Sequence, residues 1–182
     1  MNWITTIEPS PWRIAGYHLG PLLYGHCLLM ERFKGPNTPT ALDLWRCLNI
    51  ASRPYDQARL WLTDDLNCSL SIKRWAFLRV VGKMPRFEEV LTAWNDYMEE
   101  NTATPEVMTN DSSGDDFGTP YLQSLFNVAV SSLNYSPQEI YHARFGQLVW
   151  SILAWNESQG GCRVVSDELS EVFKKMRCQT LS

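Results

Sequence analysis

Apolar side chains recur at helical spacing along most of this chain, and short polar breaks that contain proline or glycine separate the periodic stretches. Five of the ten prolines directly follow a Ser or Thr, so a hydroxyl that can cap a helix stands before a residue whose backbone is already helical. At Ser136 the sequence Ser-Pro-Gln-Glu also forms a capping box, in which Ser and Glu139 satisfy each other's backbone N–H groups. The periodic stretches predict helices over residues 21–35, 38–51, 55–63, 71–82, 85–100, 119–133, 136–160 (one helix or a pair) and 166–177.

About eight helices with short connections predict an all-α fold, a helical bundle. Residues 101–118 interrupt this pattern, because Asn, Thr, Asp, Ser and Gly dominate there and cannot bury enough apolar surface to offset the entropy of ordering. We therefore expect an irregular N-terminal arm over 1–19, a main helical bundle over 20–100, an acidic and polar flexible linker over 101–118, and C-terminal helices over 119–178 that pack on or beside the bundle. A short strand over 163–165 is compatible with the pattern, but the fold does not need it.

The net charge and the cysteine spacing argue against two kinds of site, one that binds nucleic acid and one that binds zinc. The chain holds 16 Lys and Arg against 20 Asp and Glu, a net charge of −4, and never more than two adjacent basic residues. This balance argues against nucleic-acid binding, which draws on many phosphate contacts. The five cysteines are odd in number and lack zinc-binding spacing, so we expect free thiols in a reducing cytoplasm. The chain shows neither the pattern of a signal peptide nor an apolar run that would cross a membrane.

No catalytic, cofactor-binding or metal-binding motif stands out. His26 and Cys27 are adjacent, and neighbours on a helix point about 100° apart, so they cannot act together as base and nucleophile. His18 and His142 show no metal-ligand spacing with other residues, and no glycine-rich phosphate loop is present. We therefore predict a protein that is not an enzyme and that has no cofactor and no metal site.

Tryptophan is the most informative residue type here, with eight copies. Six of them lie on predicted helices, and most of these six are expected in the core: Trp45, Trp61, Trp75, Trp94, Trp150 and Trp155. Trp150 and Trp155 are five residues apart, so their side chains leave one helix about 140° apart. Either that helix is enclosed all round, or one Trp faces a groove that binds a partner, since aromatic anchors dominate interface energetics. The candidate partner-binding residues are Leu122, Phe126, Tyr141, Trp150 and Trp155.

Three segments carry a resemblance to a known family. Residues 20–33, which read Gly-Pro-Leu-Leu-Tyr-Gly-His-Cys-Leu-Leu-Met-Glu-Arg-Phe, resemble a Leu-x-x-Gly-His-x-x-Leu-Leu helix near the start of certain tailed-phage proteins. Residues 48–55 (Leu-Asn-Ile-Ala-Ser-Arg-Pro-Tyr) resemble the helix end that follows it there. Residues 135–140 (Tyr-Ser-Pro-Gln-Glu-Ile) resemble a Gly-Tyr-Ser-x-x-Glu element that closes the domain, although Asn134 stands here in place of the glycine. These proteins are the tail assembly chaperone-like products of tailed bacteriophages that are associated with the tape measure protein.

The resemblance implies a small, helical, non-catalytic protein of the host cytoplasm. It would escort the long, aggregation-prone helix of the tape measure protein during tail assembly, and its partner would be a protein client that presents an amphipathic helix. No catalytic residue transfers from this family. The alternatives are a virion structural or connector component that assembles with itself, and a generic helical adaptor.

Overall fold

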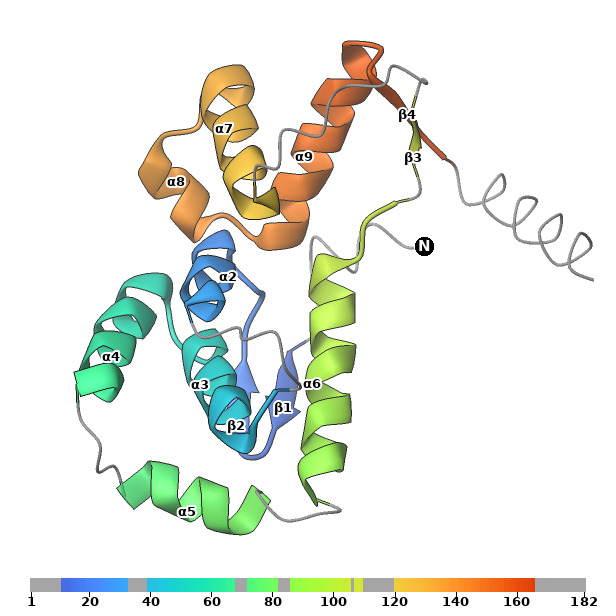
Figure 1. The fold of residues 1–182 in the computed structure, drawn as a ribbon. Helices are drawn as coiled ribbons and strands as arrows, with labels where there is room; N and C mark the ends of the chain where they lie inside the picture. The colour runs from blue at the N-terminus through green and yellow to red at the C-terminus, as the bar shows by residue number, and fades with distance from the viewer. Residues whose placement is uncertain are drawn as a thin grey trace, which may run out of the picture.

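The computed structural model describes residues 11–32, 39–67, 72–81, 86–105, 107–109 and 120–165. The fold is mainly helical, as the sequence predicts, with only short strands among the described residues (Figure 1). In chain order the elements are β1 (Trp12–Ile14), β2 (Tyr17–Leu19), α2 (Tyr24–Glu31), α3 (Ala41–Ala51), α4 (Tyr55–Asn67), α5 (Ile72–Val81), α6 (Arg86–Thr102), β3 (Val107–Thr109), α7 (Tyr121–Leu133), α8 (Pro137–His142), α9 (Phe145–Ser158) and β4 (Cys162–Val164). The helix expected over residues 166–177 and the cap expected at Ser69 or Ser71 lie outside the described residues.

The N-terminal segment contains a β-hairpin. Strands β1 and β2 pair antiparallel around a tight turn at Ala15 and Gly16, whose φ angles are 49° and 85°. Glycine adopts such a backbone without strain, and the turn brings Ile14 and Leu19 into the core. The expected irregular arm over 1–19 is therefore wrong for the hairpin, where alternation over only three residues per strand is too short to be read as a period.

Part of the expected linker over 101–118 is regular structure, and residues 106 and 110–118 lie outside the described residues. Helix α6 continues to Thr102, and β3 follows within the same polar stretch. Strand β3 pairs antiparallel with β4, so the strand that the pattern allowed over 163–165 is present and begins at Cys162. A polar segment gains order here because a distant strand supplies its backbone hydrogen bonds.

Two long-range backbone hydrogen bonds join the start of α2 to the connection between α8 and α9. The N–H of Tyr24 donates to the carbonyl of Ala143 at 2.9 Å, and the N–H of Phe145 donates to the carbonyl of Leu22 at 2.8 Å. This pairing requires extended backbone on both sides. It explains why α2 begins at Tyr24 rather than at Pro21, and why the last long periodic stretch is a pair of helices rather than one.

Local caps account for two further boundaries. The Ser136 hydroxyl accepts from the N–H of Glu139 at 3.3 Å, and the Glu139 carboxylate accepts from the N–H of Ser136 at 2.8 Å, which confirms the predicted capping box. Helix α3 has the same arrangement, in which the Thr40 hydroxyl accepts from the N–H of Asp43 at 3.2 Å. This cap places the start of α3 at Ala41, after the Thr-Pro pair at residue 38.

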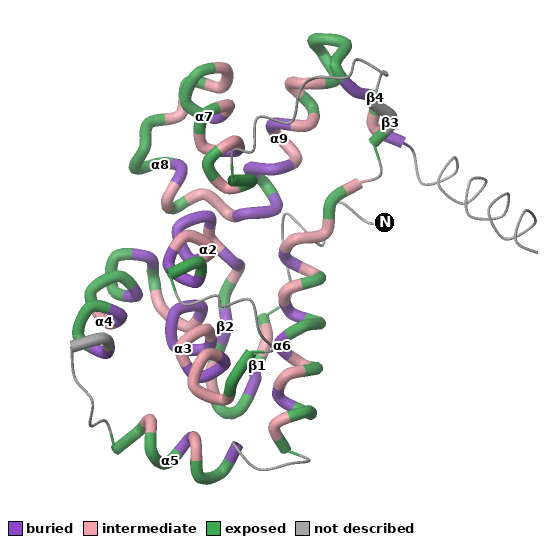
Figure 2. Tube along the Cα trace, in the orientation of Figure 1, coloured by how far each residue is buried: buried purple, intermediate pink, exposed green. Residues whose placement is uncertain are grey.

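One hydrophobic core extends from the hairpin to α9, and the buried positions line the inner side of most helices (Figure 2). Helix α8 packs on α2, α9 packs on α6, and α7 packs on both α8 and α9. Asn101 closes the core at this junction, where its side-chain carbonyl accepts from the N–H of Leu22 at 2.8 Å. The largest fully buried side chains are Leu22, Tyr24, His26, Leu44, Leu48, Ile50, Leu62, Tyr97, Ile140 and Leu148.

Candidate partner-binding surfaces

Three of the five predicted partner-binding residues meet tyrosines of α2 and α4. The rings of Phe126 and Tyr141 stack with centroids 6.1 Å apart, and Tyr141 stacks in turn on Tyr55 at 5.3 Å. The Leu122 carbonyl accepts from the Tyr24 hydroxyl at 2.7 Å, and burial raises the pKa of Tyr24 to about 12. Leu122, Phe126 and Tyr141 are all half-buried. Their main contribution is to hold α7 and α8 against α2 and α4.

Gly25 allows this close packing. A Cβ atom at this position would lie 2.7 Å from the carbonyl oxygen of Tyr141 and would collide with the ring of Tyr55. Any larger residue would therefore push α2 away from α4 and α8.

His26, at the next position of the same helix, is held by hydrogen bonds on both ring nitrogens. Its Nε2 lies 3.0 Å from the carbonyl of Arg53, and its Nδ1 accepts from the N–H of Leu23 at 3.3 Å. Burial lowers the pKa of His26 to about 4, so the ring is neutral at physiological pH and carries its proton on Nε2. Residues 20–32, 48–55 and 135–140, the described parts of the three segments on which the resemblance rests, thus lie at or around α2.

A pocket of about 270 Å³ opens beside His26 and Arg53. Its polar groups are already engaged, because the Arg53 guanidinium donates to the Asn49 side chain at 2.9 Å and both His26 nitrogens are bonded. The arrangement stabilises the end of α3 and presents no nucleophile with an adjacent base. Within the described residues, no three His, Cys, Asp or Glu side chains gather as a metal site would require.

Trp150 and Trp155 lie on opposite flanks of α9. The buried face of this helix is formed by Phe145, Leu148, Val149 and Ile152, and both tryptophans are half-buried beside it. Because the two side chains leave the helix about 140° apart, at most one of them can border the side that carries Phe126 and Tyr141. A role for these residues in partner binding stays a prediction.

A second surface, on α5, was not predicted from the sequence. The side chains of Ile72, Trp75 and Val80 are 85%, 61% and 54% exposed. They share the outward side of the helix with further exposed residues, so that α5 is mostly exposed along its length (Figure 2). We call this surface the α5 outer face; it comprises Ile72, Lys73, Trp75, Ala76, Arg79 and Val80.

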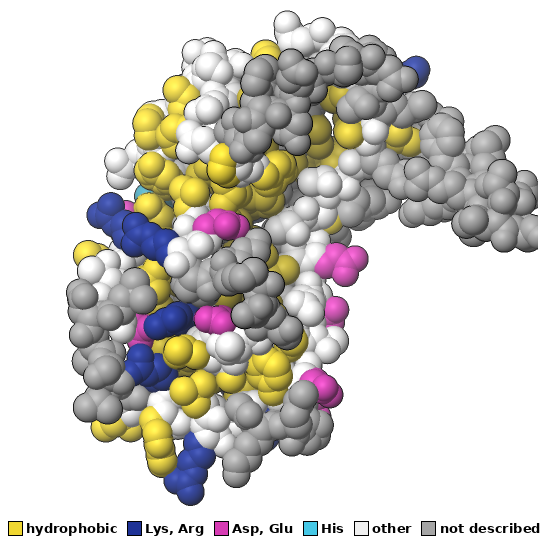
Figure 3. Space-filling view, viewed as in Figure 1, with side chains coloured by type: hydrophobic (Ala, Val, Ile, Leu, Met, Phe, Trp, Pro, Cys, Tyr) yellow, Lys and Arg dark blue, Asp and Glu magenta, His cyan; other side chains and the backbone are white. Residues whose placement is uncertain are grey.

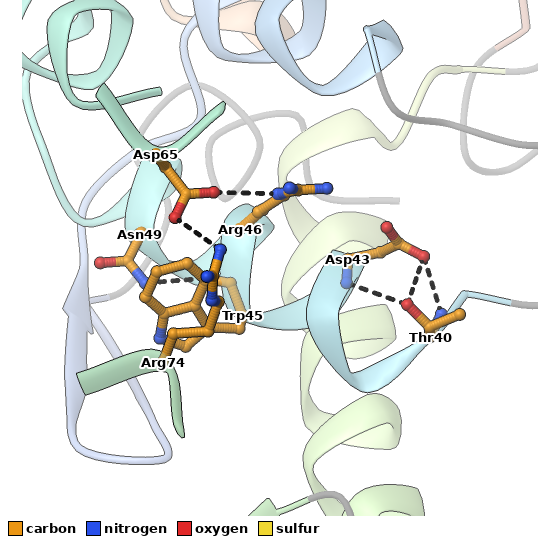
Figure 4. A network of polar contacts seen from close by, with 7 residues as sticks. All are labelled: Thr40, Asp43, Trp45, Arg46, Asn49, Asp65 and Arg74. Carbon is orange, nitrogen blue, oxygen red and sulfur yellow. Dashed lines mark hydrogen bonds and ion pairs between the residues drawn. The ribbon is translucent and has the colours of Figure 1, made fainter. Parts of the chain in front are cut away.

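The opposite side of α5 is firmly anchored. Phe77 and Val81 are buried, and the ring of Phe77 meets that of Tyr17 edge-on at 6.3 Å. Asp65 of α4, whose side chain is only 3% exposed, lies between Arg46 of α3 at 3.1 Å and Arg74 of α5 at 3.5 Å (Figure 4). These contacts hold α5 with its apolar outer face toward solvent.

The charged residues on α5 itself are all positive. Lys73 and Arg79 are exposed, and α5 contains no acidic residue. The Arg79 guanidinium lies 5.0 Å from the centre of the Trp75 ring, a cation–π contact that keeps the charge beside the apolar surface. In Figure 3, hydrophobic and basic side chains appear together at the end of the molecule where α5 lies.

The sequence did contain a signal for this surface. Apolar residues surround α5, as they surround α9, and such a helix must be covered on more than one side. Trp75 is one of six helical tryptophans of which most were expected in the core, and the sequence did not single it out, because it shows that a helix is apolar on two sides but not how many neighbours the helix has. Helix α5 packs on α3 and α6 only, among the described helices with substantial contacts.

No helix within the described residues is both long and apolar enough to cross a bilayer. No protein-family model, curated protein or solved structure matches this chain.

Proposed function

We propose that this protein is a non-catalytic tail assembly chaperone of the bacteriophage type, which binds a helical client such as the tape measure protein in the host cytoplasm. The observation that carries the proposal is the α5 outer face, where Trp75 and its apolar neighbours face solvent on a helix anchored from behind. An exposed apolar surface that contains Trp and Arg has the composition of an interface hot spot. The resemblance of three segments that meet around α2 supports the choice of family.

A client helix would lie along α5 and cover Ile72, Trp75 and Val80. Because α5 is already positioned by Asp65 and Phe77, binding requires little ordering of the chaperone, and more of the interaction energy appears as affinity. This arrangement would protect the apolar stripe of an unassembled client until its own partners replace the chaperone.

The test compares Trp75→Ala with Tyr121→Ala, an aromatic residue on α7 that is 57% exposed and lies away from α5. Purified fragments of the tape measure protein from the same genome serve as ligands, and Kd is measured by fluorescence anisotropy. Trp75→Ala should weaken binding by about 2 kcal/mol, roughly 30-fold, with no loss of thermal stability, and Tyr121→Ala should leave Kd unchanged. Equal effects of the two variants would contradict the proposal.

The self-assembling alternative makes a different prediction. A structural or connector component would form a ring or polymer in the absence of any client, through an exposed apolar surface of this kind. Mass photometry of the pure protein measures this directly. A monomer or small oligomer favours the chaperone, and a closed ring that Trp75→Ala dissociates would refute it.

A further inference from the structure

The α5 outer face has a charge pattern as well as an apolar centre. Ile72, Ala76 and Val80 follow one another along the helix at spacings of four residues, so they form a single stripe. On a helical projection, Lys73 lies on one side of this stripe, and Arg79, stacked on Trp75, lies on the other. An apolar stripe is therefore bordered by a cation on each side, with no acidic residue on the helix to neutralise them.

We infer that the occupant of this face is an amphipathic helix whose apolar stripe is bordered by Asp or Glu. This inference rests on the proposed function, because it names the chemistry of the client that α5 binds. Carboxylates at the border positions would approach Lys73 and Arg79, while the apolar centre of the client covers Ile72 and Val80. Complementary charges along the border of the stripe would determine which client binds and how fast it associates, and would contribute less to the total affinity.

A second copy of this chain does not fit the face equally well. Two α5 helices packed together would bring Lys73 and Arg79 of both copies into one interface without a carboxylate between them. The acidic helix α6 presents only polar or charged side chains at its exposed positions, including Glu88, Glu89 and Glu99, and so it has no apolar stripe to offer. In Figure 3, acidic side chains line the side of the molecule where α6 lies.

An anionic membrane surface fits less well than a helix. Helix α6 packs against α5 and carries exposed Glu88 and Glu89 in its first turn, so a flat anionic surface laid over α5 would face carboxylates on the neighbouring helix. The chain as a whole carries a net charge of −4. A client helix is narrow enough to contact α5 alone, whereas a bilayer is not.

The test uses two labelled designed peptides with the same apolar stripe, one bordered by Glu and the other by Lys. Against the full chain, the Glu-bordered peptide should bind about 10-fold more tightly at low salt, and the preference should decrease as ionic strength rises. The charge-reversed variant Lys73→Glu with Arg79→Glu should prefer the Lys-bordered peptide. Its matched control, Arg59→Glu with Arg163→Glu, changes net charge equally at exposed positions outside α5 and should keep the original preference.

The outcomes separate this inference from the proposed function. If both peptides bind equally and Trp75→Ala weakens both, α5 is a client-binding surface and the inference about charge is wrong. If neither peptide binds, the proposed function fails together with the inference. Sedimentation with vesicles of phosphatidylglycerol and phosphatidylcholine provides the last arm: binding to these vesicles that the double Glu variant abolishes, without peptide binding, would assign the face to lipid and overturn both.

Discussion

Helices α5 and α9 have similar sequences in one respect, since both carry apolar residues around most of their circumference, yet the fold treats them differently. Helix α9 packs against α6, α7 and β4, which bury Leu148, Val149 and Ile152. Helix α5 packs against α3 and α6 on one side, and its other side remains exposed. An all-round apolar helix thus shows that something must cover it, and only the fold shows whether the cover belongs to the same chain.

The largest expected effect is on the free energy of unfolding, which should fall when a side chain of α9 is truncated and stay nearly unchanged when a side chain of α5 is truncated. Leu148→Ala on α9 removes a side chain that is 1% exposed and should lower the free energy of unfolding by about 3 kcal/mol, because a buried cavity remains. Ile72→Ala on α5 removes a side chain that is 85% exposed and should change it by less than about 0.5 kcal/mol. Urea denaturation measures both, and comparable losses would mean that the α5 outer face is covered in the isolated protein.

Lowering the pH should reduce the stability of the protein through His26 in the packed region around α2, and not through a residue of α5. The pKa of His26 is about 4 in the folded chain, where burial disfavours the charged ring, against the ordinary 6.5 in the unfolded chain. The unfolded chain therefore binds a proton between these values that the folded chain does not. Stability is full above pH 6.5 and should fall by about 3 kcal/mol as the pH approaches 4. Denaturation curves of His26→Gln should lose this dependence, and curves of His18→Gln, at an exposed position of β2, should retain it.

The anchor of α5 can be weakened without touching its outer face. Asp65→Asn removes the charge that lies between Arg46 and Arg74 and should lower stability by about 2 kcal/mol, since two cations lose their common partner. Hydrogen exchange should rise in α5 and stay unchanged in α9. Asp64→Asn, at the exposed neighbouring position, is the control, and equal exchange in the two variants would show that the ion pairs do not position α5.

The smallest expected effect concerns the half-buried ring on α9. Trp155→Ala should lower the free energy of unfolding by about 1 kcal/mol and leave the client Kd unchanged, because part of the ring already packs on its own chain. Trp75→Ala should do the reverse. A Trp155→Ala variant that loses client binding would move the client-binding surface from α5 to α9, where the sequence pattern first suggested it.

Local features of the sequence predicted local features of the fold. The Ser136 capping box and most helices are where the periodicity indicated, because caps and apolar stripes depend on residues three or four positions apart. The start of α2 and the pairing of β3 with β4 depend on residues far away in the chain, and these were misplaced or left open. The exposure of Trp75 belongs to the second kind, since it depends on which of the described helices pack over α5, and those with substantial contacts leave one of its sides open.

The backbone bonds between Leu22 and Phe145, and between Tyr24 and Ala143, also set an order of events during synthesis. A ribosome that adds about 5–20 residues per second needs on the order of ten seconds to proceed from α2 to α9. During this interval the N–H of Tyr24 and the carbonyl of Leu22 have no intramolecular partner, so the N-terminal helices emerge before the segment that completes their packing. The start of α2 therefore completes its backbone hydrogen bonding only after the connection between α8 and α9 has been synthesised.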